Sequence, residues 1–365
     1  MSEEKPHDLF LFEGISYMVF NKDFTQVALS KKDNNIYIYS IEDIRNTDSW
    51  KLLYKLDVHI LYISGLDWNP YTNKILSCSY DKTSFVWNFN DNKWTSSKAL
   101  SSSKLGYLCC KWNSRGDKFC EGTSDSNLLI GYYNTEAERW MTKNIEAHKS
   151  SVVCCEIDPT SLLVISGSTD FKVYISSCYL PKIDDFHLSE QTKSLAQEFG
   201  NILYEFPMNC WVNSVAWTPS GKLGLVAGQD STIAVFDYME KNSDIIKCNH
   251  SPVTYILDNG EQSFYAVCYD RNILEYEKKE GRWEVKKTIT VKKRLKSEMD
   301  SEEFDIRKYI HICRSCPYPK PKVDTLRTKK NPHNHQSIIS SINIKDEIII
   351  TTDIAGFVKY WDIEK

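Results

Sequence analysis

A motif that returns about every 40 to 45 residues is the strongest constraint on the fold of this chain. In its clearest copy, His59 precedes a strand-like segment ending at Trp68, and a turn follows at Asn69-Pro70. A second apolar segment leads to Asp81, and a third ends at Trp87, six residues after that aspartate. A repeat of this length indicates a fold built from one supersecondary unit per copy.

Seven copies of the motif can be placed along the chain. Their aspartates are Asp33, Asp81, Asp125, Asp170, Asp230, Asp270 and Asp353. A histidine precedes the aspartate in three of the clear copies, as His59, His148 and His250. Asp125 and Asp353 stand eight residues before their aromatic partners instead of six, so we expect altered hydrogen-bond networks in these two copies.

The aspartate has a structural role, because its carboxylate can accept hydrogen bonds from turn N–H groups and from the preceding histidine. Each copy also reads as short strands bounded by turn residues, which predicts one four-stranded antiparallel blade. A blade cannot bury both faces alone, but a closed ring of blades can. The sequence therefore predicts an all-β fold: a single seven-bladed WD-repeat β-propeller over residues 1–365. The predicted structural blade residues are His59, Asp81, Trp87, His148, Asp170, Asp230 and Asp270.

The spacing of the aspartates locates two insertions. Asp81, Asp125 and Asp170 are separated by 44 and 45 residues, but Asp170 and Asp230 are 60 apart. Asp270 and Asp353 are separated by 83 residues. We assign the surplus to an inter-blade insert at 181–207 and to a charged arm at 292–334, between blades 6 and 7. We expect the ring to close through the N-terminal segment and the last strand, 358–362.

Composition narrows the classes of partner. The chain is 41% hydrophobic and carries a net charge of −4, so it can bury a sizeable core and has no global basic field for nucleic acid or membrane lipid. No apolar window is long enough to span a bilayer, and the polar residues of 1–10 do not resemble a secretory signal. We expect reduced cysteines, a protein partner, no nucleic acid and no membrane.

Three phrases of the sequence carry a resemblance to a known family. They are Asn21 to Ala28, Gly65 to Pro70 and Asp170 to Val173. The resemblance extends into the fifth blade through Trp211-Val212 and Asp230 to Thr232. In this order they resemble the WD-repeat subunit, about forty kilodaltons, of the actin-related protein 2/3 complex. The resemblance covers roughly the first three quarters of the chain and resumes in the last blade, but the residues of 292–334 do not follow it.

The resemblance implies a non-enzymatic scaffold that supports actin filament nucleation and branching. Its implied partners are actin-related proteins, smaller subunits of the same complex, the actin filament and nucleation-promoting activators. It implies a cytoplasmic protein of the actin cytoskeleton, with a nuclear pool also open, and no cofactor, since the chain has no Gly-rich phosphate loop. The alternative is a generic WD-repeat adaptor of another assembly.

The insert also contains a possible metal site. Cys313 and Cys316, with His333 and His335, supply enough ligands for tetrahedral zinc, and His311 lies nearby. The competing interpretation is a loop with free thiols, because the motif is a lone CxxC and a proline run follows it. A zinc-dependent hydrolase would need a general base beside this cluster, and the sequence offers none. The repeated His59, His148 and His250 are interpreted as structural residues.

Basic residues concentrate in the arm and give it a predicted partner-binding role. They are Lys292, Lys293, Arg294, Lys320, Lys322, Arg327, Lys329 and Lys330. Acidic residues from Glu298 to Asp305 follow the first cluster, so a solvated arm of mixed charge is the alternative.

Overall fold

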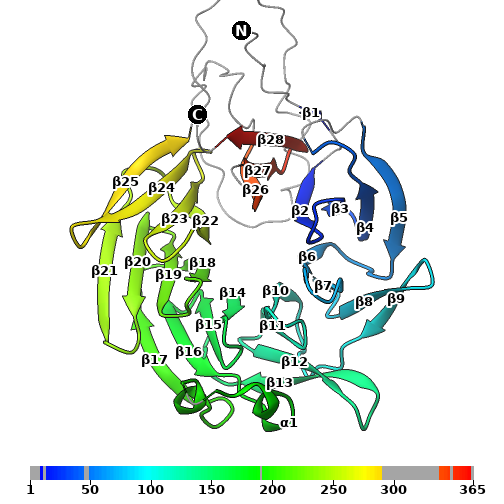
Figure 1. Ribbon diagram of the computed structural model, residues 1–365, viewed down its shortest axis with the longest axis horizontal. Coiled ribbons are helices and arrows are strands. Elements are labelled where there is room, and N and C mark those ends of the chain that lie inside the picture. The colour runs from blue at the N-terminus through cyan, green and yellow to red at the C-terminus, as the bar shows by residue number, and fades with distance from the viewer. Residues whose placement is uncertain are drawn as a thin grey trace, which may run out of the picture. The chain divides into compact units, whose positions relative to one another are not determined.

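The repeat folds into four-stranded antiparallel sheets arranged around a common axis (Figure 1). The computed structural model describes residues 9–10, 14–44, 49–189, 191–289, 337–345 and 348–362. Within these residues there are seven sheets, and each has four strands. The predicted seven-bladed β-propeller is confirmed.

The first four blades follow one another along the chain. Blade 1 comprises β2 (Ile15–Phe20), β3 (Gln26–Lys31), β4 (Asn35–Ser40) and β5 (Lys51–Asp57). Blade 2 comprises β6 (Ile63–Trp68), β7 (Ile75–Ser79), β8 (Ser84–Asn90) and β9 (Lys93–Lys98). Blade 3 comprises β10 (Tyr107–Trp112), β11 (Lys118–Thr123), β12 (Leu128–Asn134) and β13 (Arg139–Ile145). Blade 4 comprises β14 (Val152–Ile157), β15 (Leu163–Ser168), β16 (Lys172–Ser177) and β17 (Ile202–Pro207).

Blades 5 and 6 continue this order, and the last blade, blade 7, combines strands from both ends of the sequence. Blade 5 comprises β18 (Val212–Trp217), β19 (Leu223–Gly228), β20 (Thr232–Asp237) and β21 (Asn242–Lys247). Blade 6 comprises β22 (Val253–Asp258), β23 (Ser263–Cys268), β24 (Ile273–Lys279) and β25 (Arg282–Ile289). Blade 7 comprises β26 (Ile339–Lys345), β27 (Ile348–Asp353), β28 (Phe357–Asp362) and β1 (Leu9–Phe10).

The pairing of β1 with β28 closes the ring. Leu9 is opposite Val358 and Phe10 is opposite Phe357, in antiparallel register. This confirms the expectation that the N-terminal segment and the last strand share a blade. β1 is the fourth strand of blade 7 and covers the outer edge of the third strand, β28. Blade 7 therefore has four strands, like the other six blades.

The second and third strands of each blade are buried because they have neighbouring blades on both sides. The strand β15 (LVISGS) is buried at every position, whereas the fourth strand β5 (KLLYKLD) is mostly exposed. Six apolar clusters each fill the space between two adjacent blades. One of them joins Ile15 and Leu29 of blade 1 to Ile350 and Val358 of blade 7. The sequence of each strand therefore matches its place between blades.

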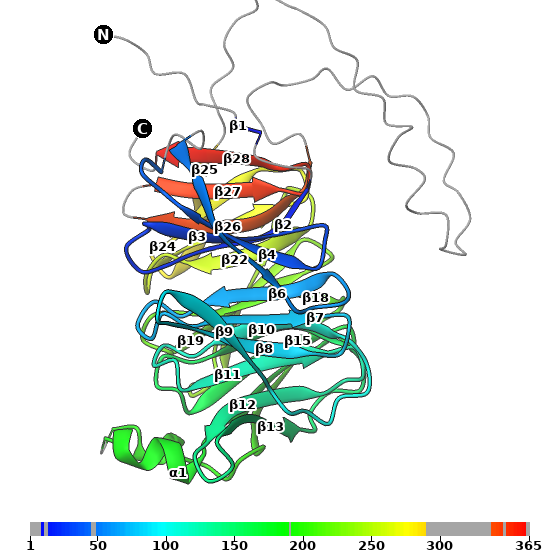
Figure 2. The same ribbon diagram turned by 90° about the vertical axis from the view of Figure 1, so that its right-hand side faces the viewer.

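The predicted inter-blade insert 181–207 requires a correction. Residues 202–207 form β17, the fourth strand of blade 4, which pairs with β16. The surplus residues precede β17 and include α1 (Pro181–Asp184) with the 3-10 turns η2 (Asp185–His187) and η3 (Lys193–Leu195). They lie within one blade, and α1 stands at the outer edge of the ring (Figures 1 and 2).

The longer predicted insertion does fall between blades 6 and 7, because β25 ends at Ile289 and β26 begins at Ile339. The arm 292–334 itself lies outside the described residues. Among the helices that the structure describes, none is long and apolar enough to cross a membrane.

Candidate protein-interaction site

The antiparallel strands give the ring two distinct faces. The connections between second and third strands, and those from one blade to the next, all lie at one end of the strands. We call this end the top face and the opposite end the bottom face. On the top face, a backbone N–H in the first of these connections donates to a carbonyl in the second, in every blade. The donor and acceptor pairs are Lys32–Gly14, Tyr80–Tyr62, Ser124–Gly106, Thr169–Ser151, Gln229–Trp211, Tyr269–Pro252 and Ile354–Ile338, at 2.9 to 3.2 Å.

The aspartate of the repeat fixes these top-face connections. In blade 2, the Asp81 carboxylate accepts from the backbone N–H of Ile60 at 2.7 Å and of Thr83 at 2.9 Å. His59 Nδ1 lies 3.3 Å from the same carboxylate, and His59 Nε2 lies 2.9 Å from Ser77 Oγ. Trp87 donates its indole N–H to Ser77 at 2.9 Å. The predicted hydrogen bonds between histidine, turn and aspartate are therefore present.

Other blades use the same geometry with different partners. His148 Nδ1 lies 3.1 Å from Asp170, and His250 Nδ1 lies 3.0 Å from Asp270. Cys210 takes the histidine position in blade 5, with its Sγ 3.0 Å from Asp230 Oδ1. In these three blades a donor from the preceding connection lies beside the carboxylate, so the connection is held against the turn.

The two copies with unusual spacing keep a hydrogen-bonded turn. Asp125 accepts from Ser103 Oγ at 2.9 Å and from the backbone N–H of Lys104 at 2.9 Å, so serine stands where other blades have histidine. Asp353 accepts from the N–H groups of Ala355 and Phe357, each at 3.0 Å. As expected, the hydrogen-bond partners of these two aspartates differ from those in the other blades, but both turns are still hydrogen-bonded.

The pKa shifts in blade 2 agree with a structural role. Burial lowers the pKa of His59 even though Asp81 opposes the shift, so the imidazole is neutral near pH 7. Burial by itself would raise the pKa of Asp81, but hydrogen bonds from Thr83, Ile60 and His59 outweigh it and lower the pKa. A neutral histidine that orients a carboxylate stabilises a loop and offers no exposed base for catalysis.

The loop that follows His59 presents apolar side chains to solvent. Ile60 is 81% exposed, and Leu61 and Tyr62 are exposed beside it. Tyr80 of the neighbouring turn and Leu105 of the next blade connection are also exposed. We call these five residues the top-face apolar patch. They adjoin one another, because Tyr80 bonds to Tyr62, and a Cβ at position 106, next to Leu105, would lie 3.0 Å from Tyr80 Cα.

Two residues of the patch, Tyr62 and Tyr80, also line the central channel. The channel has a volume of about 710 Å³ and is lined by residues of all seven first strands. Residues of the top-face connections, among them Tyr62, Tyr80 and Tyr269, also line it. Contiguous apolar surface of this kind on a folded protein typically marks a protein-interaction site. Aromatic side chains are also enriched where protein interfaces gain most of their binding energy.

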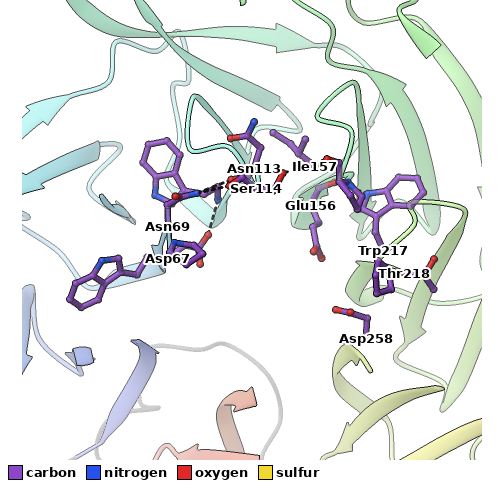
Figure 3. A pocket seen from close by; sticks show the side chains of 14 residues that line it. Asp67, Asn69, Asn113, Ser114, Glu156, Ile157, Trp217, Thr218 and Asp258 are labelled. Atoms are coloured by element: carbon purple, nitrogen blue, oxygen red, sulfur yellow. Dashed lines mark hydrogen bonds between the residues drawn. The ribbon is translucent and has the colours of Figure 1, made fainter. Parts of the chain in front are cut away.

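The bottom end of the channel is acidic. Asp67, Glu156 and Asp258 converge on a pocket of about 260 Å³ (Figure 3). Burial raises the pKa of Glu156 to about 7 and also raises the pKa of Asp258. Lys111 supplies a compensating charge, and Asp67 raises the pKa of this lysine. In the part of the chain that the structure describes, no group of three or more histidine, cysteine, aspartate or glutamate residues could hold a metal ion.

Several predicted site residues cannot be placed. The possible zinc ligands Cys313, Cys316, His333 and His335 lie outside the described residues. The same holds for the basic residues of the arm, Lys292, Lys293, Arg294, Lys320, Lys322, Arg327, Lys329 and Lys330.

Sequence reasoning missed the top-face apolar patch. The signal was present in the repeat, because the residues after His59 are Ile-Leu-Tyr, whereas those after His148 are Lys-Ser-Ser. This loop makes the same hydrogen bonds in both blades, although its side chains are apolar in one and polar in the other. The fold therefore does not require the apolar side chains.

A family model matches parts of the chain. The model of the WD domain, G-beta repeat, matches residues 50–88, 140–175 and 200–237. Each match begins near the start of the fourth strand of one blade. It ends within the third strand of the next blade. Fold and repeat together define the class: the chain is a seven-bladed WD-repeat β-propeller.

Curated relatives narrow the class further. The chain is 29% identical to actin-related protein 2/3 complex subunit 1A-A of Xenopus laevis over 267 residues, which are 72% of this chain and 70% of the relative. It is 27% identical to subunit 1A of Arabidopsis thaliana, over 78% of this chain and 76% of the relative. It is 22% identical to subunit 1 of Schizosaccharomyces pombe, over 72% and 71%. The predicted resemblance to the WD-repeat subunit, subunit 1, of the actin-related protein 2/3 complex is confirmed.

Proposed function

We propose that this chain is a non-enzymatic scaffold subunit of an actin-related protein 2/3 complex, in which it supports actin filament nucleation and branching. The similarity to subunit 1 proteins from an animal, a plant and a yeast carries the proposal. Its partners in this function are actin-related proteins and the smaller subunits of the same complex. A closed ring with fixed loops suits a scaffold, because it presents surfaces that need little ordering on binding.

The top-face apolar patch is the docking surface that we assign to another subunit of the complex. Ile60, Leu61 and Tyr62 are exposed, yet Asp81 and the backbone of Tyr80 hold the backbone that carries them. A partner that covers this patch buries aromatic and aliphatic area without first ordering the loop.

The arm is the second contact that we propose. Its basic residues, beginning with Lys292, Lys293 and Arg294, would bind the actin filament or a nucleation-promoting activator. We also propose that the chain acts in the cytoplasm, at the actin cytoskeleton. These assignments rest on the charge of the segment and on the names of the relatives.

Co-purification tests the function directly. We expect an affinity-tagged full-length chain, expressed in its own cells, to recover actin-related proteins and smaller subunits in equal amounts, as measured by mass spectrometry. Recovery of a different stable assembly without actin-related proteins would reject the proposal and favour a generic WD-repeat adaptor.

A matched pair of variants tests the docking surface. Leu61→Asp places a charge in the top-face apolar patch, whereas Ile245→Asp places one on β21, where Ile245 is also exposed. We expect the first variant to reduce recovery of the complex at least about tenfold, which corresponds to about 1.4 kcal/mol of binding free energy. The second should recover it normally, and both should melt close to the unmodified chain. Equal recovery by both variants would exclude the patch as a docking surface.

Charge reversal tests the arm. We expect Lys292→Glu, Lys293→Glu and Arg294→Glu together to weaken branching in a pyrene-actin assay, most strongly at low salt where charges are least screened. The melting temperature should not change. Normal branching by a complex that lacks 292–334 would show that the arm is dispensable.

A further inference from the structure

The channel wall carries a cluster of thiols that the scaffold function does not use. Cys109, Cys110, Cys154 and Cys155 line the channel as two adjacent pairs, one on β10 and one on β14. All cysteines in the described residues are free of disulfide bonds. The two pairs meet between blades 3 and 4, where Cys109 Sγ lies 3.5 Å from Cys155 Sγ.

The fold holds these two sulfur atoms together. The first strand of each blade has a register shift near its start, between Tyr107 and Cys109 in β10 and between Val152 and Cys154 in β14. The blades approach closely at this level, because a Cβ at Gly122 would lie 2.4 Å from Val152 O and 2.7 Å from Cys109 Sγ. A disulfide bond is about 2.05 Å long, so closing the gap requires a movement of about 1.5 Å by the two side chains.

We propose that Cys109 and Cys155 form an oxidisable dithiol, which hydrogen peroxide converts into a disulfide between blades 3 and 4. The Cys109 side chain is partly exposed to the channel, whereas Cys155 is buried. The channel has room for peroxide, since its volume of about 710 Å³ exceeds that of many water molecules.

The order of reaction follows from exposure and acidity. Hydrogen bonds with Cys109 and Cys120, together with burial, raise the pKa of the Cys155 thiol, so its thiolate is scarce. Cys109 therefore reacts first: its sulfur attacks peroxide, the O–O bond breaks, and Cys109 sulfenic acid and one water form. The Cys155 sulfur then attacks the sulfenic sulfur, its proton leaves with the hydroxide as a second water, and the S–S bond forms. Two electrons pass from the two sulfurs to one peroxide.

The bond would add a second covalent link between blades 3 and 4, which the chain already connects between β13 and β14. It encloses the third blade and the start of the fourth in one covalent loop, which restricts the unfolded chain. We expect the oxidised chain to melt at a higher temperature than the reduced chain, and a reductant to reverse the shift.

Mass spectrometry of the full-length chain tests the proposal without any variant. The chain is treated with hydrogen peroxide at neutral pH, unfolded and alkylated, and then digested with trypsin. We expect a reducible cross-link between peptide 105–111, which holds Cys109 and Cys110, and peptide 150–172, which holds Cys154 and Cys155.

Single variants assign the bond within these peptides. Cys109→Ser and Cys155→Ser should abolish the cross-link and the shift in melting temperature. Cys110→Ser and Cys154→Ser are the matched controls, and both should retain the cross-link.

Other results would overturn the proposal. A cross-link from peptide 119–139, which contains Cys120, to peptide 150–172 would assign the oxidation to a different pair. Overoxidation of Cys109 to sulfinic acid without any cross-link would show that the two sulfurs do not meet. Loss of the cross-link in Cys110→Ser or Cys154→Ser but not in Cys109→Ser would contradict the assignment.

Discussion

The surplus residues of blade 4 are attached to blade 3 by a buried ion pair, and its removal should cost substantial stability. The Lys118 ammonium donates to Asp184 Oδ2 at 2.7 Å, and both side chains are 0% exposed. It also donates to the carbonyls of Ser161 at 2.5 Å and Cys178 at 3.1 Å. Asp184 belongs to α1, so one lysine of β11 joins β11, the turn before β15 and the helix.

The change Lys118→Met removes the charge and keeps most of the side-chain volume. It leaves a buried carboxylate whose other partners are Arg115, through an ion pair, and the backbone N–H of Leu180 at 2.7 Å. Removing one member of a buried pair typically costs 3 to 5 kcal/mol, because the remaining charge stays in the interior. Since Arg115 still compensates Asp184, we expect a loss of about 3 kcal/mol in the free energy of unfolding.

Urea unfolding followed by tryptophan fluorescence measures this loss. The control is Lys182→Met, because Lys182 pairs with Glu136 at 2.8 Å on the same insert but with both side chains largely exposed. The control should unfold at the same urea concentration as the unmodified chain. In the double variant Lys118→Met/Asp184→Leu, much of the stability should return, because no charge is left buried. A loss below about 1 kcal/mol for Lys118→Met would refute the assignment of the pair as a buried anchor.

Three further changes test the blades. Asp81→Ala should lower stability by about 1 to 3 kcal/mol by urea unfolding, because it leaves the N–H groups of Ile60 and Thr83 unpaired; an unchanged unfolding midpoint would contradict its structural role. Glu121 is fully buried and burial raises its pKa to about 8, above the ordinary value of 4.5; its contribution to stability is therefore complete below about pH 4.5 and is lost as the pH rises through 8. Glu121→Gln should flatten the fall in unfolding free energy between pH 5 and 8, and a fall as steep as in the unmodified chain would show that Glu121 does not titrate in this range. Deleting residues 335–365 removes three strands of blade 7, so we expect aggregation or a broad melting transition, and a soluble deletion with one sharp transition would argue against ring closure.

The number of blades could be predicted from the sequence because each blade repeats one turn. Asp81 lies three residues before β8, and Asp125 lies three residues before β12, so the two turns are equivalent. The distance from Asp125 to Tyr133 was a poorer guide, because that aromatic residue lies further along its strand. The turn recurs just before the third strand in both blades, whereas the position of the aromatic residue within that strand varies.

Contacts between distant residues could not be predicted. The spacing of Asp170 and Asp230 gives the size of the surplus in blade 4, but not which connection contains it. Lys118 and Asp184 are 66 residues apart, and a buried lysine has no sequence signature that distinguishes it from an exposed one. The top-face apolar patch also depends on how loops from different blades meet, which the repeat alone does not determine.

The pairing of β1 with β28 has a consequence for how the chain reaches its folded state. Leu9 is made early in synthesis, but its partner Val358 is made almost 350 residues later. The side chain of Asn343 in blade 7 likewise donates to the carbonyl of Met18 in blade 1 at 3.0 Å. Contacts with such large separation form slowly, so the early blades must persist with an open edge until blade 7 has been translated. A ribosome-bound chain that stops before β28 should therefore be the form that chaperones bind most strongly.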